Sequence, residues 1–254
     1  MDLKKVKEIE GRGKTLIIYG DSGKGKTWLA GTLPENKTLI IDIDGGIETL
    51  IGTGSNHTFI QLRMTTEDLE AGNIGYSRLV KLFAELRENE GKYEYIVVDS
   101  MSELEKYLLY SLKTERGKEF LSMSEYGGVA DQLREIIRWF RDLTEQGINV
   151  IFTALEMPLA IQENENGTIT RAFPMLMKKL SPEFCGLVDM IGRVEVNPKT
   201  QERRIRFMGN DDIIAKTRIA GVGEFENPDL GALFEKINGV SKEKKTKKEK
   251  GGKE

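Results

Sequence analysis

Four residues at fixed spacing form the clearest chemical pattern in the sequence. Gly20, Gly25, Lys26 and Thr27 occupy the required positions of the pattern G-x-x-x-x-G-K-[ST]. In this pattern the loop amides surround a polyphosphate, the lysine reaches its β and γ oxygens, and the hydroxyl binds Mg²⁺. The pattern therefore predicts a site for ATP with Mg²⁺. The residues expected at the nucleotide are Gly20, Asp21, Ser22, Gly23, Lys24, Gly25, Lys26, Thr27 and Trp28.

The segments on both sides of this loop support the interpretation. An apolar run at Thr15–Tyr19 predicts a strand before the loop, and Lys26–Leu33 is compatible with a helix after it. A helix that begins near Lys26 turns the positive end of its dipole toward a bound anion. The alternative is a chance turn rich in glycine and lysine. Such a turn would need neither a strand before it nor a helix after it.

Two further apolar runs end in acidic residues. The run Tyr95–Val98 leads into Asp99, which we expect to hold Mg²⁺ through water, opposite the threonine hydroxyl of the loop. The run Thr38–Ile43 leads into Asp44, our candidate for orienting or deprotonating an attacking water. Asp42 competes for this role, and a simple turn carboxylate before the following glycines is the alternative.

Short apolar runs alternate with helical patterns in the first part of the chain. The expected strands are Thr15–Tyr19, Thr38–Ile43, His57–Leu62, Tyr95–Val98 and Asn149–Phe152, and the expected helices are Lys26–Leu33, Tyr76–Asn89, Ser102–Thr114 and Glu125–Gln146. In the last helix apolar residues recur every three or four positions, so Trp139 and Phe140 are expected to pack in the core. This alternation predicts a mainly parallel sheet flanked by helices, with the phosphate loop at its carboxyl edge.

The pattern after Phe152 is that of antiparallel ribbons. The expected strands are Leu159–Gln162 and Thr168–Arg171 around an Asn166-Gly167 turn, and then Arg193–Val196, Arg203–Phe207 and Asp212–Lys216. We expect these strands to continue the central sheet. Because no repeat or linker precedes Gly239, residues 1–240 are predicted to form one domain and residues 241–254 a tail.

The composition is typical of a soluble protein. The chain has 254 residues, of which 39% are hydrophobic, enough for one sizeable core. It has neither an apolar run long enough to span a membrane nor a secretory h-region near Met1. Its single cysteine, Cys185, fits a reducing cytoplasm and, among apolar neighbours, is expected to be buried. The single histidine, His57, is expected to be structural.

The charge of the chain is unevenly placed. Residues 241–254 hold seven Lys and three Glu, which leaves 31 basic and 38 acidic residues in the body, a net charge of −7. The tail has no apolar residue and is expected to be disordered. An acidic body argues against strong autonomous binding to duplex DNA, which usually needs a basic face.

The order and spacing of Gly20–Thr27, Asp44 and Asp99-Ser100 resemble the RecA-like ATPase core. Three later segments are similar to a group of small phage and prophage RecA-like ATPases, the Sak-type single-strand-annealing recombination proteins: Gly147–Ala154, Gly186–Asp189 and Ala215–Arg218. The likeness covers residues 14–240, with the phosphate loop as its most diagnostic part. It implies an α/β fold of the RecA-like P-loop NTPase type in a cytoplasmic phage or prophage protein of a bacterial host.

By the same resemblance, Lys216 and Arg218 are expected to reach the γ-phosphate in a neighbouring subunit, as an arginine finger does. Two positions apart on a strand, they would point to one face. A solvated pair on an edge strand is the alternative. The chain departs from the RecA-like pattern at Leu155, where Gln or His is usual, with Thr153 and Glu156 beside it. It also carries a shorter Asp where RecA carries the catalytic Glu.

The leading expectation is a homo-oligomeric ring or filament that hydrolyses ATP and acts on single-stranded DNA in phage recombination or replication, together with a single-strand-binding protein. The residues expected at the DNA are Arg171, Lys178, Lys179, Arg204 and Arg206, with Arg203 beside them. Arg204 and Arg206 would share one strand face. Two alternatives are a nucleotide or small-molecule kinase, although no Arg-rich lid segment is evident, and a non-hydrolysing scaffold that switches with ATP.

Overall fold

A central β-sheet forms the middle layer of the protein. The computed structural model describes residues 11–62, 75–88, 91–164 and 167–239. In these residues the strand order of the sheet is β11-β9-β8-β1-β5-β4-β2-β3, and β10 also pairs with β8. The strands are β1 (Thr15–Tyr19), β2 (Thr38–Asp42), β3 (Thr58–Gln61), β4 (Tyr95–Asp99), β5 (Asn149–Ala154), β8 (Met190–Val196), β9 (Arg203–Arg206), β10 (Lys216–Thr217) and β11 (Phe225–Glu226).

The strands from β8 to β3 run parallel, and the added ribbon strands run antiparallel. β1, β2 and β4 are buried along their whole length, as expected for apolar strands covered on both faces. The P-loop strand β1 and the Asp99 strand β4 both pair with β5, which lies between them. Since parallel strands end at the same edge, this order brings the phosphate loop and Asp99 together.

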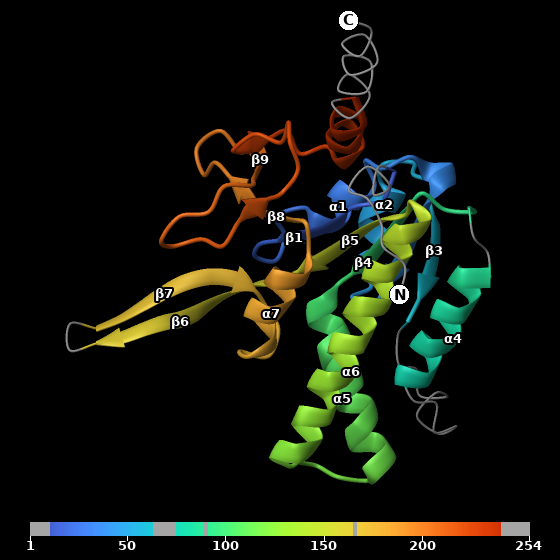
Figure 1. Ribbon diagram of the computed structural model, residues 1–254, viewed down its shortest axis with the longest axis vertical. Helices are drawn as coiled ribbons and strands as arrows, with labels where there is room; N and C mark the ends of the chain where they lie inside the picture. Colours follow the sequence, from blue (N-terminus) through green and yellow to red (C-terminus); the bar gives the residue numbers. More distant parts are fainter. Residues whose placement is uncertain (1–10, 63–74, 89–90, 165–166, 240–254) are drawn as a thin grey trace, which may run out of the picture.

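Successive residues of each strand contribute to two different cores. Ile17 and Tyr19 of β1 pack in the larger core with α4, α5, α6 and α7, whereas Leu16 and Ile18 pack in the smaller one with α1 and residues 230–237. The same alternation holds in the neighbouring strands, because side chains of a strand point to opposite faces in turn. Figure 1 shows α5 and α6 on one side of the sheet and α1 on the other.

Two of the longer helices begin at serine caps. The helices are α1 (Lys26–Ala30), α2 (Glu48–Ile51), α4 (Gly75–Glu88), α5 (Met101–Arg116), α6 (Met123–Asp142) and α7 (Leu180–Leu187), with short 3₁₀ turns η2 (Glu35–Lys37) and η3 (Leu143–Gln146). Ser100 caps α5, and Ser122 with Glu125 forms a capping box at α6. None of the helices in the described ranges is long and apolar enough to cross a membrane.

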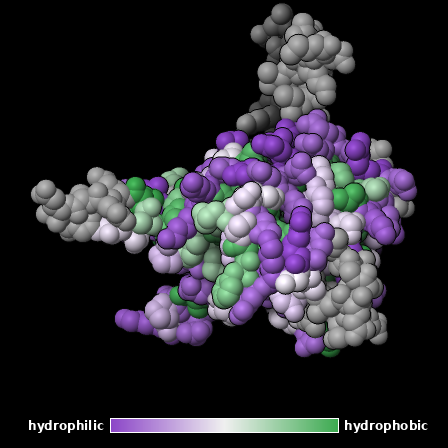
Figure 2. Space-filling view, turned by 90° about the horizontal axis from the view of Figure 1, so that it is seen from below, coloured by the Kyte–Doolittle hydropathy of each residue, from purple (hydrophilic) through white to green (hydrophobic). Residues whose placement is uncertain are grey.

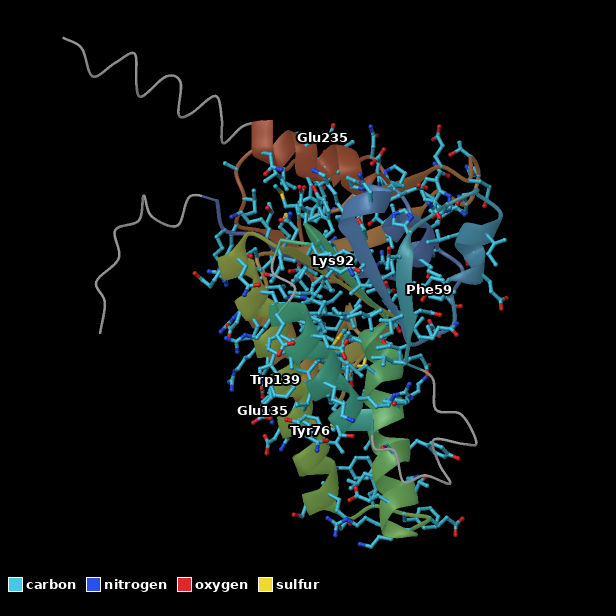
Figure 3. All side chains as sticks on the ribbon, turned by 90° about the vertical axis from the view of Figure 1, so that its right-hand side faces the viewer. Phe59, Tyr76, Lys92, Glu135, Trp139 and Glu235 are labelled. Atoms are coloured by element: carbon cyan, nitrogen blue, oxygen red, sulfur yellow. The ribbon has the colours of Figure 1, made fainter. Side chains whose placement is uncertain are left out.

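The packing roles expected of two aromatic residues are confirmed. Phe140 is buried, and the ring of Trp139 stacks on Phe83 at a centroid distance of 5.5 Å. Tyr76 lies against the same tryptophan and donates its hydroxyl hydrogen to Glu135 at 2.5 Å (Figure 3). These contacts join α4 to α6 on the outer side of the larger core.

The burial expected of Cys185 is confirmed, and His57 makes local contacts. Cys185 is buried, and burial raises the pKa of its thiol to about 12, so it stays protonated. The His57 ring contacts the carbonyl oxygen of Leu33 at 3.0 Å and the Ser55 hydroxyl at 2.5 Å, as a structural residue does.

The first ribbon differs from the expectation that it would continue the central sheet. β6 (Glu156–Asn164) and β7 (Gly167–Pro174) form a separate two-stranded sheet that projects from the body (Figure 1), and β7 makes a single further bridge, from Ala172 to Ile213. Hydrophobic residues extend along this hairpin among hydrophilic ones (Figure 2), and Ile161 and Ile169 are exposed on it. The predicted hairpin is confirmed, but the prediction that it continues the central sheet is wrong. Asn166 of the expected turn lies outside the described residues.

The second ribbon follows the prediction more closely. β8 pairs with β1 and then with β9, so this part does continue the central sheet. The expected strand Asp212–Lys216 is wrong over most of its length, because only Lys216 belongs to β10, and Ile213 forms a single bridge to Ala172. Residues 241–254, the expected tail, lie outside the described residues. The arrangement as a whole is the predicted α/β fold, with a mostly parallel central sheet flanked by helices and added antiparallel strands, and it is consistent with a P-loop NTPase.

Candidate nucleotide and catalytic site

The loop from Gly20 to Gly25 connects β1 to α1 and folds around the Lys26 side chain. Gly23 (φ 76°) and Gly25 (φ 92°) adopt the left-handed region, which residues with a Cβ rarely adopt. Lys26 Nζ donates to the carbonyl oxygens of Gly20 and Asp21, both at 2.9 Å. The loop therefore already has the curled form in which its interior cation faces the phosphate position.

The Lys26 ammonium is buried and short of counter-charge. Burial lowers its pKa, and the charges of Asp99, Asp44 and Asp21 oppose this shift only in part. A desolvated cation of this kind is stabilised by an anion that enters the loop. The site is thus prepared electrostatically for a polyphosphate.

The other lysine of the loop is engaged differently. Lys24 Nζ forms an ion pair with Asp21 Oδ2 at 2.7 Å, and the hydrogen bond from Lys24 lowers the pKa of Asp21. Lys24 and Lys26 both belong to the predicted phosphate-binding set, but only Lys26 is directed into the loop. A direct contact between Lys24 and phosphate would require this ion pair to open.

A hydroxyl and a carboxylate meet at the expected metal position. Thr27 Oγ1 donates to Asp99 Oδ2 at 2.6 Å, and the Thr153 hydroxyl donates to the other carboxylate oxygen. Asp99 is 1% exposed, and burial raises its pKa while the two hydroxyl hydrogen bonds oppose the shift. These hard oxygen donors fit Mg²⁺, which proteins usually bind through one or two carboxylates, water and substrate phosphate.

The backbone of Gly46 lies unusually close to the side chains at this metal position. A Cβ placed on Gly46 would lie 2.9 Å from Thr27 Oγ1 and 3.6 Å from Asp99 Oδ2. A glycine therefore leaves room there for the Thr27 hydroxyl, which any larger residue would displace. This close approach of the end of β2 to α1 joins segments about twenty residues apart, so residue spacing does not reveal it.

The structure separates the two candidates for the water-orienting carboxylate. Asp42 is fully buried and accepts hydrogen bonds from the Gly45 amide at 2.8 Å and from Gln61 Nε2 at 3.2 Å, so it holds the turn. Asp44 is exposed, and its amide donates to the Asp99 carbonyl oxygen at 3.2 Å. This geometry leaves Asp44 free for an attacking water.

The environment of Asp44 changes its acidity. Burial of part of the carboxyl raises its pKa, and the negative charges of Asp99 and Glu103 raise it further. Lys26 and Lys106 act in the opposite direction. A raised pKa makes a carboxylate a better proton acceptor at neutral pH, which suits a general base.

Lys216 and Arg218 do not approach the phosphate loop of their own chain. Lys216 pairs with Ile191, toward the start of β8, whereas the loop leaves the far end of β1. Burial and the neighbouring Arg218 lower the pKa of Lys216. Arg218 follows β10 and donates to the Gly186 carbonyl oxygen at 3.4 Å.

Among the predicted DNA contacts, the three arginines are tied to the protein. Arg204 and Arg206 do share a face, as predicted, but both pair with Glu195 at 2.8 Å and lie over the Phe225 ring. Arg206 also pairs with Glu224, and Arg171 donates to the Asp211 carbonyl oxygen. Lys178 and Lys179 are exposed, and in the described part of the chain neither has an ion pair.

One ion pair near the loop could not be found from the sequence. Glu156 at the start of β6 accepts from Arg193 Nε at 2.7 Å and from Nη2 at 2.8 Å, which links the hairpin to β8. The positive charge of Arg193 also lowers the pKa of Asp21 in the loop. This ion pair lies beside Leu155, the position at which the RecA-like pattern usually has Gln or His.

Comparison with known proteins agrees with this geometry. Residues 12–219 match the AAA domain family, a region that includes the phosphate loop, Asp44, Asp99 and both later ribbons. None of the curated proteins matches the chain. Because the family match covers most of its length, the chain belongs to the AAA domain family, whose members are generally P-loop ATPases.

Proposed function

We propose that this protein binds ATP with Mg²⁺ and hydrolyses it. The observation that carries the proposal is the meeting of Lys26, Thr27, Asp99 and Asp44 at one edge of the parallel sheet. These residues come from the ends of β1, β2 and β4, and each has a role that phosphoryl transfer to water requires. Family membership supports nucleotide binding in general, and the arrangement of the carboxylates supports hydrolysis.

Each side chain has a distinct task in the proposed reaction. The loop amides and Lys26 bind the β- and γ-phosphates and offset their charge. Thr27 and Asp99 would hold Mg²⁺, which neutralises charge on the phosphate oxygens when bound. Asp44 orients the attacking water and accepts its proton, for which its raised pKa is favourable.

The direct test is phosphate release from ATP with and without Mg²⁺, for wild type and Asp44→Asn. The proposal predicts Mg²⁺-dependent release that falls strongly in the variant, whereas ATP affinity changes little. Transfer of the γ-phosphate to an added nucleotide or small molecule would favour a kinase. Tight ATP binding without turnover would favour the non-hydrolysing switch.

We further propose that single-stranded DNA is the effector and that the protein serves phage or prophage recombination, as the resemblance to the Sak-type group suggests. Lys178 and Lys179 are exposed near the base of the β6–β7 hairpin and have no ion pair with any residue that the structure describes, which supports a phosphate contact there. Since Arg204 and Arg206 are held by Glu195, they are less available for DNA than the two lysines.

The DNA proposal is tested by ATP turnover with and without single-stranded DNA at low and moderate salt. Stimulation that weakens with salt is expected, because phosphate contacts release counterions. Lys178→Ala combined with Lys179→Ala should lower the stimulation and spare basal turnover, and Lys199→Ala is the matched control. A single-strand-binding protein is tested as an addition. No binding and no stimulation at low salt would contradict the proposal.

A further inference from the structure

A cavity of about 620 Å³ lies in the β8–β9 ribbon, outside the catalytic residues described above. This volume falls within the range of about 300–1,000 Å³ that small-molecule sites occupy. Its lining residues come from both strands, their turn and the segment after β11: Glu195, Val196, Asn197, Pro198, Glu202, Arg203, Arg204 and Asn227. β8 carries this ribbon and lies directly beside β1 (Figure 1).

Arg203 connects this cavity to the phosphate loop. A Cβ placed on Gly25, the last glycine of the loop, would lie 3.4 Å from Arg203 Nε and 3.9 Å from the Cβ of Trp28. The same arginine lines the cavity. One guanidinium therefore borders both the phosphate loop and the cavity, so a ligand that passes along it would reach both.

The Arg203 guanidinium also differs from its neighbours on β9 in its charge partners. Arg204 and Arg206 on the same strand are bound by Glu195, whereas Arg203 is exposed and has no ion pair among the residues that the structure describes. A planar cation with free faces stacks readily on an aromatic ring system. It is thus suited to a ligand that extends out of the loop.

We propose that this cavity holds the nucleoside part of the bound nucleotide, with the Arg203 guanidinium stacked on the base. The inference rests on the proposed function, since it assumes that the phosphates occupy the loop. The cavity is lined by two glutamates and two arginines, so it offers no net positive charge for further phosphate and suits the uncharged nucleoside. In this arrangement Arg203 contributes to nucleotide affinity. In the sequence it stands beside the expected DNA contacts instead.

The test compares MgATP with magnesium tripolyphosphate, which lacks the nucleoside, by titration calorimetry. Arg203→Ala is expected to weaken MgATP by about tenfold, the scale of one stacking contact, and to leave tripolyphosphate unchanged. Arg203→Lys keeps the charge but loses the plane, so it should also weaken MgATP. Lys199→Ala, on the same ribbon but outside the cavity, should change neither, and Lys26→Ala should weaken both.

The possible outcomes are distinct. Equal weakening of both ligands by Arg203→Ala would mean that this residue binds phosphate, and unchanged MgATP affinity would mean that it binds nothing; either overturns the inference. Equal affinity of wild type for MgATP and tripolyphosphate would show that the nucleoside is not held. If wild type binds neither ligand, the proposed function itself fails.

Discussion

Thr27 and Asp99, 72 positions apart in the sequence, are joined by a hydrogen bond of 2.6 Å between the threonine hydroxyl and the carboxylate. β5 lies between their strands, and its Thr153 supplies a hydrogen bond to the second carboxylate oxygen. The position expected for Mg²⁺ is therefore set by three adjacent strands of the central sheet. A rigid sheet edge of this kind holds ligands more accurately than a loop does.

Asp99→Asn is expected to impair Mg²⁺ use without harming the fold. Loss of the carboxylate removes a metal ligand, so turnover should fall by on the order of 10²-fold or more. Burial raises the pKa of Asp99 above its unfolded value, so its ionisation destabilises the folded state as pH rises through the folded pKa. The neutral variant should thus melt no lower than wild type at pH 7. A variant with full turnover at ordinary Mg²⁺ would contradict the metal assignment.

Gly46→Ala is expected to disturb the metal position directly. The added methyl group would lie 2.9 Å from Thr27 Oγ1, so the hydroxyl must move, and a displacement near 1 Å costs about 10²-fold in rate. Steady-state turnover and the Mg²⁺ concentration for half-maximal rate measure the effect. Gly52→Ala is the matched control, because its Cβ meets no atom within 4 Å and its backbone is right-handed helical. Similar behaviour of the two variants would refute the close approach.

Glu103→Gln is expected to shift the acid limb of the turnover profile to lower pH. Asp44 must be deprotonated to accept a proton, and Glu103 contributes to its raised pKa. Removing that negative charge lowers the pKa of Asp44, so activity persists to lower pH. Lys106→Ala removes a charge that lowers this pKa and should shift the limb the other way. An unchanged profile in both variants would argue against Asp44 as the base.

Arg218→Ala subunits are expected to regain activity when mixed with Lys26→Ala subunits. Lys216 and Arg218 lie away from their own loop, so in an oligomer they would act at a neighbour's site. A cation supplied in trans is worth about 10³–10⁵ in rate, so each variant alone should be nearly inactive. Turnover of the mixture over a range of ratios measures the recovery. A monomer that is fully active at every concentration would exclude this arrangement.

Much of the nucleotide site was predictable because its signals are local. β1 was predicted with the observed bounds Thr15–Tyr19, and Lys26 and Thr27 follow from the loop pattern. The start of α6 was expected two residues late, at Glu125, because the capping box with Ser122 was not considered. Local caps and apolar periods thus place elements to within a few residues.

The remaining features depend on contacts between distant segments. Alternating polarity predicts a hairpin whether or not it joins a larger sheet, so the separation of β6–β7 could not be foreseen. The choice between Asp42 and Asp44 depends on Gln61 of the neighbouring strand β3. Arg203 was grouped with its neighbours in sequence, and only the approach of its side chain to Gly25 distinguishes it from them.

The most direct test of the account is MgATP binding and turnover by Lys26→Ala. Lys26 lies inside the loop and its ammonium donates to the carbonyl oxygens of Gly20 and Asp21, so its loss should remove phosphate stabilisation but little core packing. We predict a variant that keeps the circular dichroism spectrum of wild type but loses about 10²–10³-fold in turnover, with much weaker ATP binding. Lys199→Ala, which removes the same charge elsewhere, should behave as wild type. A folded Lys26→Ala protein with unchanged ATP affinity and turnover would contradict the central claim.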